Sequence, residues 1–262
     1  MNTSLETKQR NLIKQGDIFS LGNHLVACGD CRDKEFVATV IGARKVVSVN
    51  IDPPYGVGLV ENAEGFKALL KNKVIESDHL QSNAEYRQFS REWIAAIKPH
   101  LERKNSFYIF NSDKMLFALR DAMLDEGLKF AQLLVWVKTS AVVGRLDYAP
   151  QHELILYGWH GTHTFKKSKD KSVLVFPKPS RSPHHPSTKP TSLIRRLILN
   201  STSVGDVVYD GFLGSGTCLI SCEQTKRSCI GIEIDPEYCQ TAIERWEKLT
   251  GETAKKINKT NS

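Results

Sequence analysis

The sequence predicts an α/β domain that is built on a mostly parallel sheet of seven strands, with helices on both faces. Short runs of β-branched and aromatic residues recur along the chain, helical segments separate most of them, and a polar or glycine-rich motif follows two of the runs. A chain of 262 residues is long enough to bury one such core, because α/β folds often reach about 250 residues as one unit. We therefore expect one main domain.

Periodicity and capping residues place the individual elements. The seven predicted strands are 25–28, 46–51, 106–110, 132–138, 152–157, 207–210 and 229–233. The predicted helices between them are 34–41, 85–98, 114–126, 191–200, 217–225 and 237–249. Pro236 suits the first turn of the last helix, where a missing backbone donor costs nothing.

Two segments interrupt this alternation. Residues 57–83 mix glycine, lysine and acidic residues, and we interpret them as a long loop beside the active site. Residues 158–190 are rich in His, Lys, Ser and Pro around one small predicted strand, 172–176. The polar tail from Gly251 onward is expected to be disordered.

Charge and hydropathy limit the kinds of partner. Lys and Arg total 36 against 29 Asp and Glu, a net charge of +7 that favours polyanionic partners. Six basic residues within the second interrupting segment form a candidate surface for nucleic-acid phosphates. They are Lys166, Lys167, Lys169, Lys171, Lys178 and Arg181. Neither a long apolar run nor a secretory signal is recognisable, so we expect no membrane association and a cytoplasmic location.

The cysteines predict no metal site. Of six cysteines, only Cys28 and Cys31 have C-x-x-C spacing, and no second pair follows at ligand spacing. The thiols of a cytoplasmic protein are instead expected to be reduced and buried.

The first motif with chemical content is Asp52-Pro53-Pro54-Tyr55, at the end of the predicted strand 46–51. The two prolines remove local backbone donors, so the Asp52 carboxylate and the Pro53 carbonyl stay available as acceptors. Two such acceptors suit an amino group, and Tyr55 offers a ring for stacking a base. The alternative is a rigid turn in which Asp52 only satisfies nearby amides.

The second motif runs from Asp210 to Thr217 and connects a predicted strand to a predicted helix. Gly214 and Gly216 allow close backbone approach to a ligand at the helix N-terminus. A third glycine is missing, which favours a cofactor smaller than a dinucleotide. Glu233 ends the next strand, where an acid can accept hydrogen bonds from ribose hydroxyls. The alternative is a tight turn with Glu233 on the surface.

Together these motifs resemble the β class of amino-group DNA methyltransferases, whose methyltransferase fold is a circularly permuted Rossmann-like fold. In that family the D-P-P-Y block precedes the F-x-G-x-G block, as Asp52–Tyr55 here precede Phe212–Gly216. Further matches are the segments 135–138, 152–157 and 185–190. The sequence of residues 16–30 is similar to the N-terminal segment of phage and prophage DNA methylases.

The resemblance implies S-adenosyl-L-methionine as the cofactor, DNA as the partner, and a homodimer as a frequent assembly. It implies that Asp30 holds the cofactor adenine and that Lys189 binds the cofactor carboxylate. The residues expected at the cofactor are Asp30, Asp52, Lys189, Asp210, Phe212, Gly214, Ser215, Gly216, Thr217, Glu233 and Asp235. Gly211 departs from the family pattern, which usually has proline at this position.

The resemblance also divides the chain. Residues 1–157 and 184–250 are expected to form the catalytic domain, residues 158–183 a small target-recognition insertion, and residues 251–262 the disordered tail. The reaction is expected to be direct methyl transfer to N6 of a flipped-out adenine. N4 of cytosine, adenine in RNA, and a non-catalytic DNA-binding role are the alternatives; methylation of cytosine C5 is disfavoured because no cysteine follows a proline.

Overall fold

The computed structural model describes residues 13–56, 81–141, 147–167, 169–177 and 189–257. These residues contain one mixed sheet of ten strands in the order β10-β1-β2-β9-β8-β3-β4-β6-β5-β7. The strands are β1 Ile18–Leu21, β2 His24–Cys28, β3 Val46–Ile51, β4 Leu101–Asn111, β5 Leu128–Val137, β6 His152–His160, β7 Val173–Val175, β8 Val207–Asp210, β9 Ser228–Glu233 and β10 Lys255–Ile257. The five central strands β2, β9, β8, β3 and β4 are mutually parallel.

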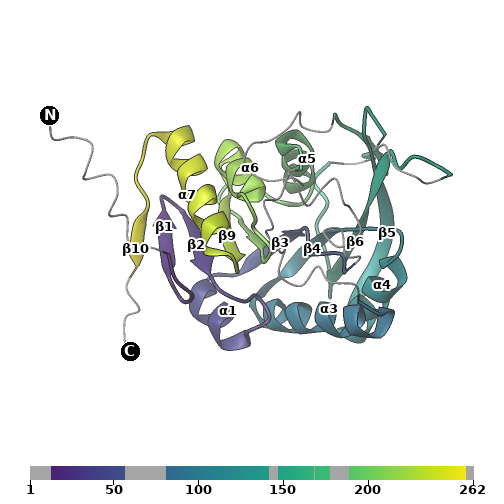
Figure 1. Cartoon of the computed structure of the whole chain (residues 1–262), viewed down its shortest axis with the longest axis horizontal. Coiled ribbons are helices and arrows are strands. Elements are labelled where there is room, and N and C mark those ends of the chain that lie inside the picture. The colour runs from purple at the N-terminus through teal and green to yellow at the C-terminus, as the bar shows by residue number, and fades with distance from the viewer. Residues whose placement is uncertain (1–12, 57–80, 142–146, 168, 178–188, 258–262) are drawn as a thin grey trace, which may run out of the picture.

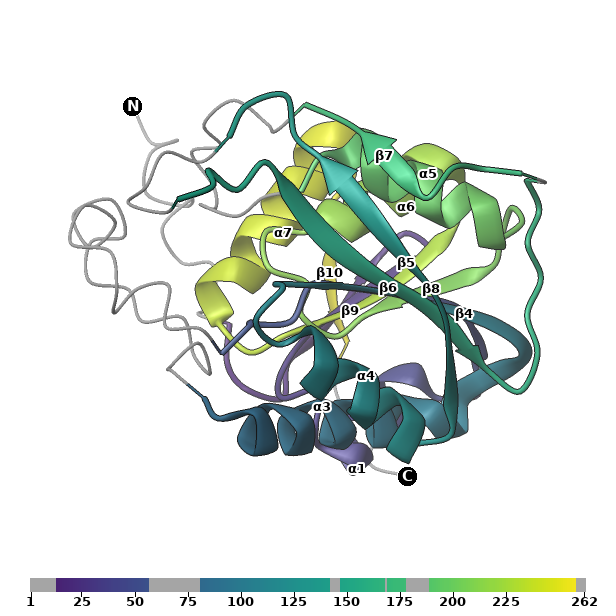
Figure 2. The same ribbon diagram turned by 90° about the vertical axis from the view of Figure 1, so that its right-hand side faces the viewer.

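Helices cover both faces of this sheet (Figures 1 and 2). The helices are α1 Lys34–Ile41, α3 Asn83–Ile97, α4 Leu116–Asp125, α5 Thr191–Ser201, α6 Thr217–Thr225 and α7 Pro236–Thr250, with a short 3₁₀ turn at Lys98–His100. One hydrophobic core joins α1, α3 and α4 to the sheet. A second core joins α5, α6 and α7 to the opposite face.

Local sequence signals account for several helix starts. The Asp33 side chain accepts from the backbone amides of Glu35 and Phe36 and so caps α1. Ser82 and Glu85 form a reciprocal capping box at the start of α3. Asp235 caps α7 with Pro236 in the first turn, as the sequence predicts.

The strand order creates a switch point between β3 and β8. From β8 the chain passes through α6 to β9 on one side, and from β3 it passes through α3 to β4 on the other. Because α3 and α6 cover opposite faces, a crevice is expected at the carboxyl ends of β3 and β8, where open α/β sheets bind ligands. Asp52 directly follows β3, and Asp210 ends β8.

The α/β class and the coverage of both faces are confirmed, and all seven expected strands are present. The number of strands was wrong, because the small strand predicted at 172–176 joins the sheet as β7 and the neighbouring strands β1 and β10 were missed. β1 has only four residues, and β10 lies in the tail that we expected to be disordered. Residues Lys255–Ile257 are ordered by pairing with β1, a long-range contact that local composition does not reveal.

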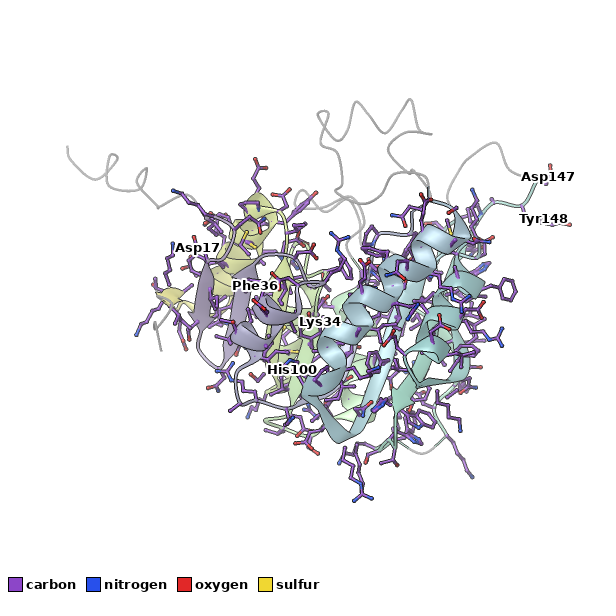
Figure 3. All side chains as sticks on the ribbon, turned by 90° about the horizontal axis from the view of Figure 1, so that it is seen from below. Asp17, Lys34, Phe36, His100, Asp147 and Tyr148 are labelled. Atoms are coloured by element: carbon purple, nitrogen blue, oxygen red, sulfur yellow. The ribbon has the colours of Figure 1, made fainter. Side chains whose placement is uncertain are left out.

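The segment before β6 lies at the periphery of the domain. Asp147 and Tyr148 project away from the body of the domain (Figure 3), and the Tyr148 side chain is 91% exposed. Among the described residues, no helix has the length and apolarity that crossing a membrane requires. The loop expected at 57–83 lies almost entirely outside the described residues.

Candidate active site

Four acidic residues gather at the carboxyl edge of the central strands. Asp30 follows β2, Asp52 follows β3, Asp210 ends β8 and Glu233 ends β9. These strands are neighbours and parallel, so their carboxyl ends meet at one edge of the sheet. The structure thus brings together the acidic residues of both sequence motifs.

The Asp52 carboxylate is held by two side chains. Its Oδ2 lies 2.6 Å from Nζ of Lys189, and its Oδ1 accepts a hydrogen bond of 2.8 Å from the Tyr55 hydroxyl. Pro53 is buried beside it, as expected of a rigid turn. Each carboxylate oxygen keeps a second lone pair, so Asp52 can still accept from an amino group. The acceptor role proposed for Asp52 is therefore compatible with its surroundings.

Glu153 is a member of this site that the sequence motifs did not identify. Its Oε2 lies 3.1 Å from Nζ of Lys189 and 3.3 Å from the Tyr55 hydroxyl, and its Oε1 lies 2.8 Å from Nζ of Lys138. Both lysines are buried. Glu153 and Lys138 occur within the segments 135–138 and 152–157 quoted for the resemblance, but no spacing rule connects them to Asp52. Antiparallel pairing of β5 and β6, with Trp136 opposite Glu153, brings them to the site.

Lys189 has two carboxylate partners within the protein. It was expected to bind the cofactor carboxylate, but its ammonium lies between Asp52 and Glu153. Burial opposes the charge of Lys189, yet the two carboxylates raise its pKa overall, so it is a cation. Lys189 therefore pairs with Asp52 and Glu153 in this structure, and its contact with the cofactor carboxylate stays a prediction.

The two carboxylates that share Lys189 have opposite pKa shifts. Burial raises the pKa of Asp52, and the pull of Lys189 is partly offset by the negative charge of Glu153. Burial also acts on Glu153, but Lys189 and Lys138 together lower its pKa to about 2. Glu153 is therefore ionised at any physiological pH, whereas Asp52 is the more basic group.

The glycine motif forms a tight turn into α6. Gly214 and Gly216 have φ angles of +52° and +84°, which glycine adopts without strain. The Gly214 amide donates to Glu233 Oε2 at 2.7 Å, and the Asp235 amide donates to Glu233 Oε1 at 2.9 Å. Glu233 is thus buried and fixes the turn, which contradicts the alternative of a surface position. One lone pair on each oxygen remains for a ligand.

Burial raises the pKa of both acids beside this turn. The pKa of Glu233 rises to about 7, even though backbone amides hydrogen-bond to the carboxylate. The pKa of Asp210 rises well above its usual range, and the nearby charges of Asp52 and Glu233 add to the effect of burial. A positively charged ligand would offset this accumulation of negative charge. The two carboxylates, which can also accept hydrogen bonds, therefore fit a cationic cofactor that carries hydroxyl groups.

Other residues expected at the cofactor have partners within the protein. The Asp30 carboxylate makes a paired contact with the Arg32 guanidinium, at 3.0 Å from Nε and 2.6 Å from Nη2. Ser215 is buried, its Oγ accepts from Arg245 at 3.0 Å, and Asp235 caps α7. Phe212 is half-buried against Phe89, with ring centroids 5.8 Å apart. Thr217 opens α6.

The glycine at position 211 has a steric reason. A Cβ atom there would lie 3.0 Å from Cβ of Cys31 and 3.0 Å from the Tyr209 hydroxyl. Both neighbours are buried, so a proline ring would require them to move. Glycine at position 211 therefore allows the segment after β2 to pack directly against the segment after β8.

The basic segment lies partly outside the described residues, which exclude Lys178 and Arg181. Lys166, Lys167, Lys169 and Lys171 are all exposed. Asp170 fixes this segment to α5 through ion pairs with Arg196 and a hydrogen bond of 2.7 Å from Asn200. Because α5 begins just after Lys189 and Asn200 is near its other end, the described lysines lie away from Asp52.

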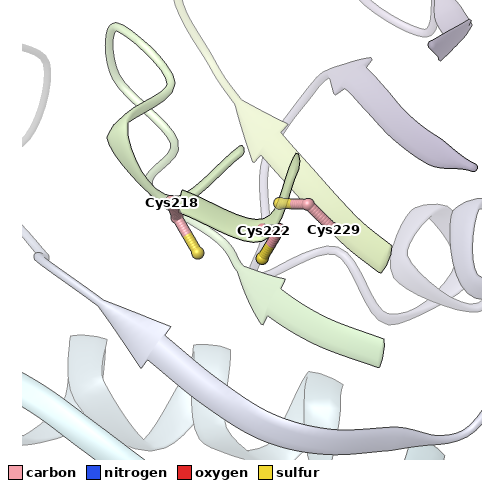
Figure 4. Close-up of side chains that lie close together, drawn as sticks. All are labelled: Cys218, Cys222 and Cys229. Atoms are coloured by element: carbon pink, nitrogen blue, oxygen red, sulfur yellow. The ribbon is translucent and has the colours of Figure 1, made fainter. Parts of the chain in front are cut away.

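The cysteines converge more than their spacing suggests. All six are free and buried, and the Sγ atoms of Cys218, Cys222 and Cys229 lie within 4.8 Å of one another between α6 and β9 (Figure 4). The pKa of each of these three thiols is raised well above its usual range. The sequence did not single out these three thiols, because only Cys28 and Cys31 have C-x-x-C spacing.

The fold and this site define a class of protein. On one side of its switch point, the Rossmann-like sheet carries the turn Asp52–Tyr55, which we call the acceptor turn. On the other side it carries the turn Gly214–Gly216, which we call the glycine turn, and the buried acids beside this turn fit a cationic cofactor. This combination fits the class of cofactor-dependent methyltransferases that act on an amino group.

Comparisons with known proteins lead to the same class. The sequence profile of the DNA methylase family of N6 and N4 methyltransferases matches residues 46–244. The type II methyltransferase M.HpaI of Haemophilus parainfluenzae is 29% identical over 220 residues, which cover 74% of this chain and 66% of that protein. The type II methyltransferase M2.DpnII of Streptococcus pneumoniae is 28% identical over 217 residues, 75% of this chain and 80% of that protein.

Solved structures show the same fold. The M1.HpyAVI–SAM complex has a TM-score of 0.62 and 25% identity, covering 84% of this chain and 98% of that one. The PvuII cytosine-N4-specific DNA methyltransferase has a TM-score of 0.70 and 17% identity, covering 95% of this chain and 92% of that one. The chain therefore belongs to the DNA methylase family, and S-adenosylmethionine is its cofactor.

Proposed function

We propose that this protein methylates the N6 amino group of adenine in DNA. The observation that carries this proposal is the position of Asp52, an ionisable acceptor at the sheet switch point, next to the glycine turn expected to hold the cofactor. An aspartate at the first position of the D-P-P-Y motif favours adenine, because serine is commoner there among the N4-cytosine enzymes that the sequence resembles.

The roles of the residues follow from this position. Asp52 and the Pro53 carbonyl accept the two hydrogens of the target amine and turn its lone pair outward, while Tyr55 contacts the base. Gly214, Gly216, Asp210 and Glu233 would hold the cofactor. The bound cofactor supplies a methyl group activated by a positively charged sulfur. The protein supplies alignment and exclusion of water, and no covalent intermediate with the protein is required.

A DNA target must be unstacked before it reaches Asp52. Flipping a base out of a duplex costs roughly a few kcal/mol, which stacking and phosphate contacts offset. Tyr55 is one stacking residue, and the highly exposed Tyr148, before β6, is a second candidate. Tyr148 had no motif to distinguish it in the sequence.

Transfer of labelled methyl groups, followed by nucleoside mass spectrometry, tests the proposal. Duplex DNA should yield labelled N6-methyladenine, and an RNA of the same sequence should not. Labelled N4-methylcytosine would keep the enzyme class and correct the base. No transfer to either nucleic acid, from a preparation that binds the cofactor, would support a non-catalytic DNA-binding role instead.

A further inference from the structure

Four charged side chains, Asp52, Lys189, Glu153 and Lys138, form a chain of ion pairs at the acceptor turn. Lys189 lies between two carboxylates, Asp52 at 2.6 Å and Glu153 at 3.1 Å. Glu153 in turn lies between two ammonium groups, Lys189 at 3.1 Å and Lys138 at 2.8 Å. Within these four side chains the two positive and two negative charges balance; Asp210 on the neighbouring strand β8, whose pKa burial raises well above its usual range, lies outside this set. The lysines are only 6% and 7% exposed, so an ammonium group that loses its partner is poorly solvated by water.

Methylation of an amino group disturbs this balance. The amine forms a bond to the methyl carbon and loses one proton, while the cofactor's sulfur keeps the electron pair of the broken bond and becomes a neutral thioether. The released proton requires an acceptor. Asp52 is the acceptor beside the amine, and its pKa is raised by burial. When Asp52 becomes neutral, the buried Lys189 cation loses one of its two counter-ions.

We propose that Glu153 is a positioning residue that maintains the charge balance of the site while Asp52 takes up the proton of the substrate amine. Glu153 remains ionised because two lysines stabilise its charge, and it continues to neutralise Lys189 after Asp52 has accepted the proton. Lys138 supports Glu153 in this role. The inference rests on the proposed role of Asp52 and adds residues that neither sequence motif contains.

Glu153 also affects how basic Asp52 is. Its negative charge raises the pKa of Asp52 directly, and it shares the lysine that would otherwise pair with Asp52 alone. Glu153→Gln removes both effects, so the pKa of Asp52 should fall. Asp52 acts in its ionised form, and the acidic limb of the rate profile should therefore move to lower pH.

The test compares three variants of the full-length protein, Glu153→Gln, Glu153→Gln/Lys138→Met and Glu102→Gln. Glu102 is an exposed carboxylate near the start of β4, at the amino end of the parallel strands and so away from Asp52. It serves as the matched control. The single Glu153 variant should lower kcat about 10- to 100-fold, because a buried cation is left without its partner. Its KM for the cofactor should stay within about 3-fold, because the glycine turn is unchanged. The acidic limb should move down by about one pH unit.

The double variant separates this role from simple structural support. It removes one positive and one negative charge. The thermal midpoint of unfolding, which should fall in Glu153→Gln, should therefore return toward the wild-type value when it is measured without cofactor. The value of kcat should nevertheless stay low, and the acidic limb should stay shifted. Recovery of kcat together with stability would overturn the inference, as would a single variant whose pH profile is unchanged.

The proposed function is tested separately by Asp52→Ala in the same assays. An inactive Asp52→Ala variant alongside a fully active Glu153→Gln variant would overturn only the positioning role. An active Asp52→Ala variant would overturn both the role of Asp52 and the inference that depends on it.

Discussion

At the scale of single residues, the surroundings of a carboxylate affect its pKa more than whether it belongs to Asp or Glu. Asp52 and Glu153 share Lys189, yet the pKa of Asp52 is raised and that of Glu153 falls to about 2. Burial raises the pKa of both groups, and the difference arises because Glu153 pairs with two lysines, Lys189 and Lys138, whereas Asp52 pairs with Lys189 alone. The site therefore contains one carboxylate suited to proton uptake and one suited to remaining charged.

Asp52→Ala should lower kcat/KM by about 10²–10³-fold or more, because the amine loses the acceptor that aligns it. Cofactor affinity should stay within a few-fold, since the cofactor turn lies on a different strand. Both quantities can be measured on one preparation, by methyl transfer and by calorimetry. Substantial methylation by this variant would remove Asp52 from the mechanism.

Glu233 should make stability depend on pH. Its pKa is about 7 in the folded protein and 4.5 in the reference state, so the folded protein retains this proton between those values while the unfolded chain loses it. The contribution of Glu233 to the free energy of unfolding is thus fully present below pH 4.5 and declines by about 3 kcal/mol as pH rises through 7.

Glu233→Gln removes this titration. Denaturant unfolding at about pH 5 and about pH 8, on either side of the Glu233 pKa, should show that wild type loses stability relative to the variant as pH rises. The variant should also bind the cofactor more weakly at the higher pH, because an uncharged amide attracts a cation less than a carboxylate does. A constant stability difference at the two pH values would show that Glu233 does not titrate in this range.

At the scale of elements, the glycine turn depends on how closely α6 approaches α7. A Cβ atom on Gly216 would lie 2.9 Å from Cβ of Ala242 and 3.2 Å from its Cα, in addition to the strain of a positive φ. From the sequence, Gly216 was expected to be glycine so that the cofactor could approach. The structure gives a second reason, which is the packing of α7.

Gly216→Ala should therefore destabilise the fold by about 1–3 kcal/mol through crowding, beyond the cost of the backbone conformation. Gly205→Ala is a matched control, because Gly205 has the same φ of +84° but no atom within 4 Å of the place that a methyl group would take. The difference in thermal midpoint between the two variants measures the crowding against Ala242. Equal destabilisation of the two variants would mean that α7 adjusts freely.

At the scale of the whole molecule, the positive charge and the sizes of the uncommitted segments predict how DNA is bound. Only 57–83 and 158–190 are sizeable segments outside the predicted core elements, so base readout is expected to be short or permissive in sequence. The four described lysines of the second segment are exposed and lie toward the far end of α5 from Asp52. That position suits phosphates distant from the target base.

Changing Lys166, Lys167, Lys169 and Lys171 together to glutamine should weaken DNA binding and flatten its salt dependence, by about one unit of slope for each phosphate that is no longer neutralised. The value of kcat at saturating DNA should not change. Lys34→Gln, on α1 of the other face (Figure 3), is the control and should leave the slope unchanged. An unaltered slope in the quadruple variant would show that these lysines do not bind phosphates.

The sequence by itself determined the seven expected strands, the six helices, the two motifs and the edge of the sheet where they meet. These features are local, since hydrophobic periodicity, caps and Gly or Pro at turns depend on neighbouring residues. Only the tertiary structure decided the partners of Asp52, because Glu153 lies 98 positions from Tyr55 and reaches it through strand pairing. The same reason explains why the sequence did not predict the β1–β10 pair, the approach of Gly216 to Ala242 or the convergence of three cysteines. Contacts between segments that are distant in the sequence depend on how the layers pack and not on local composition.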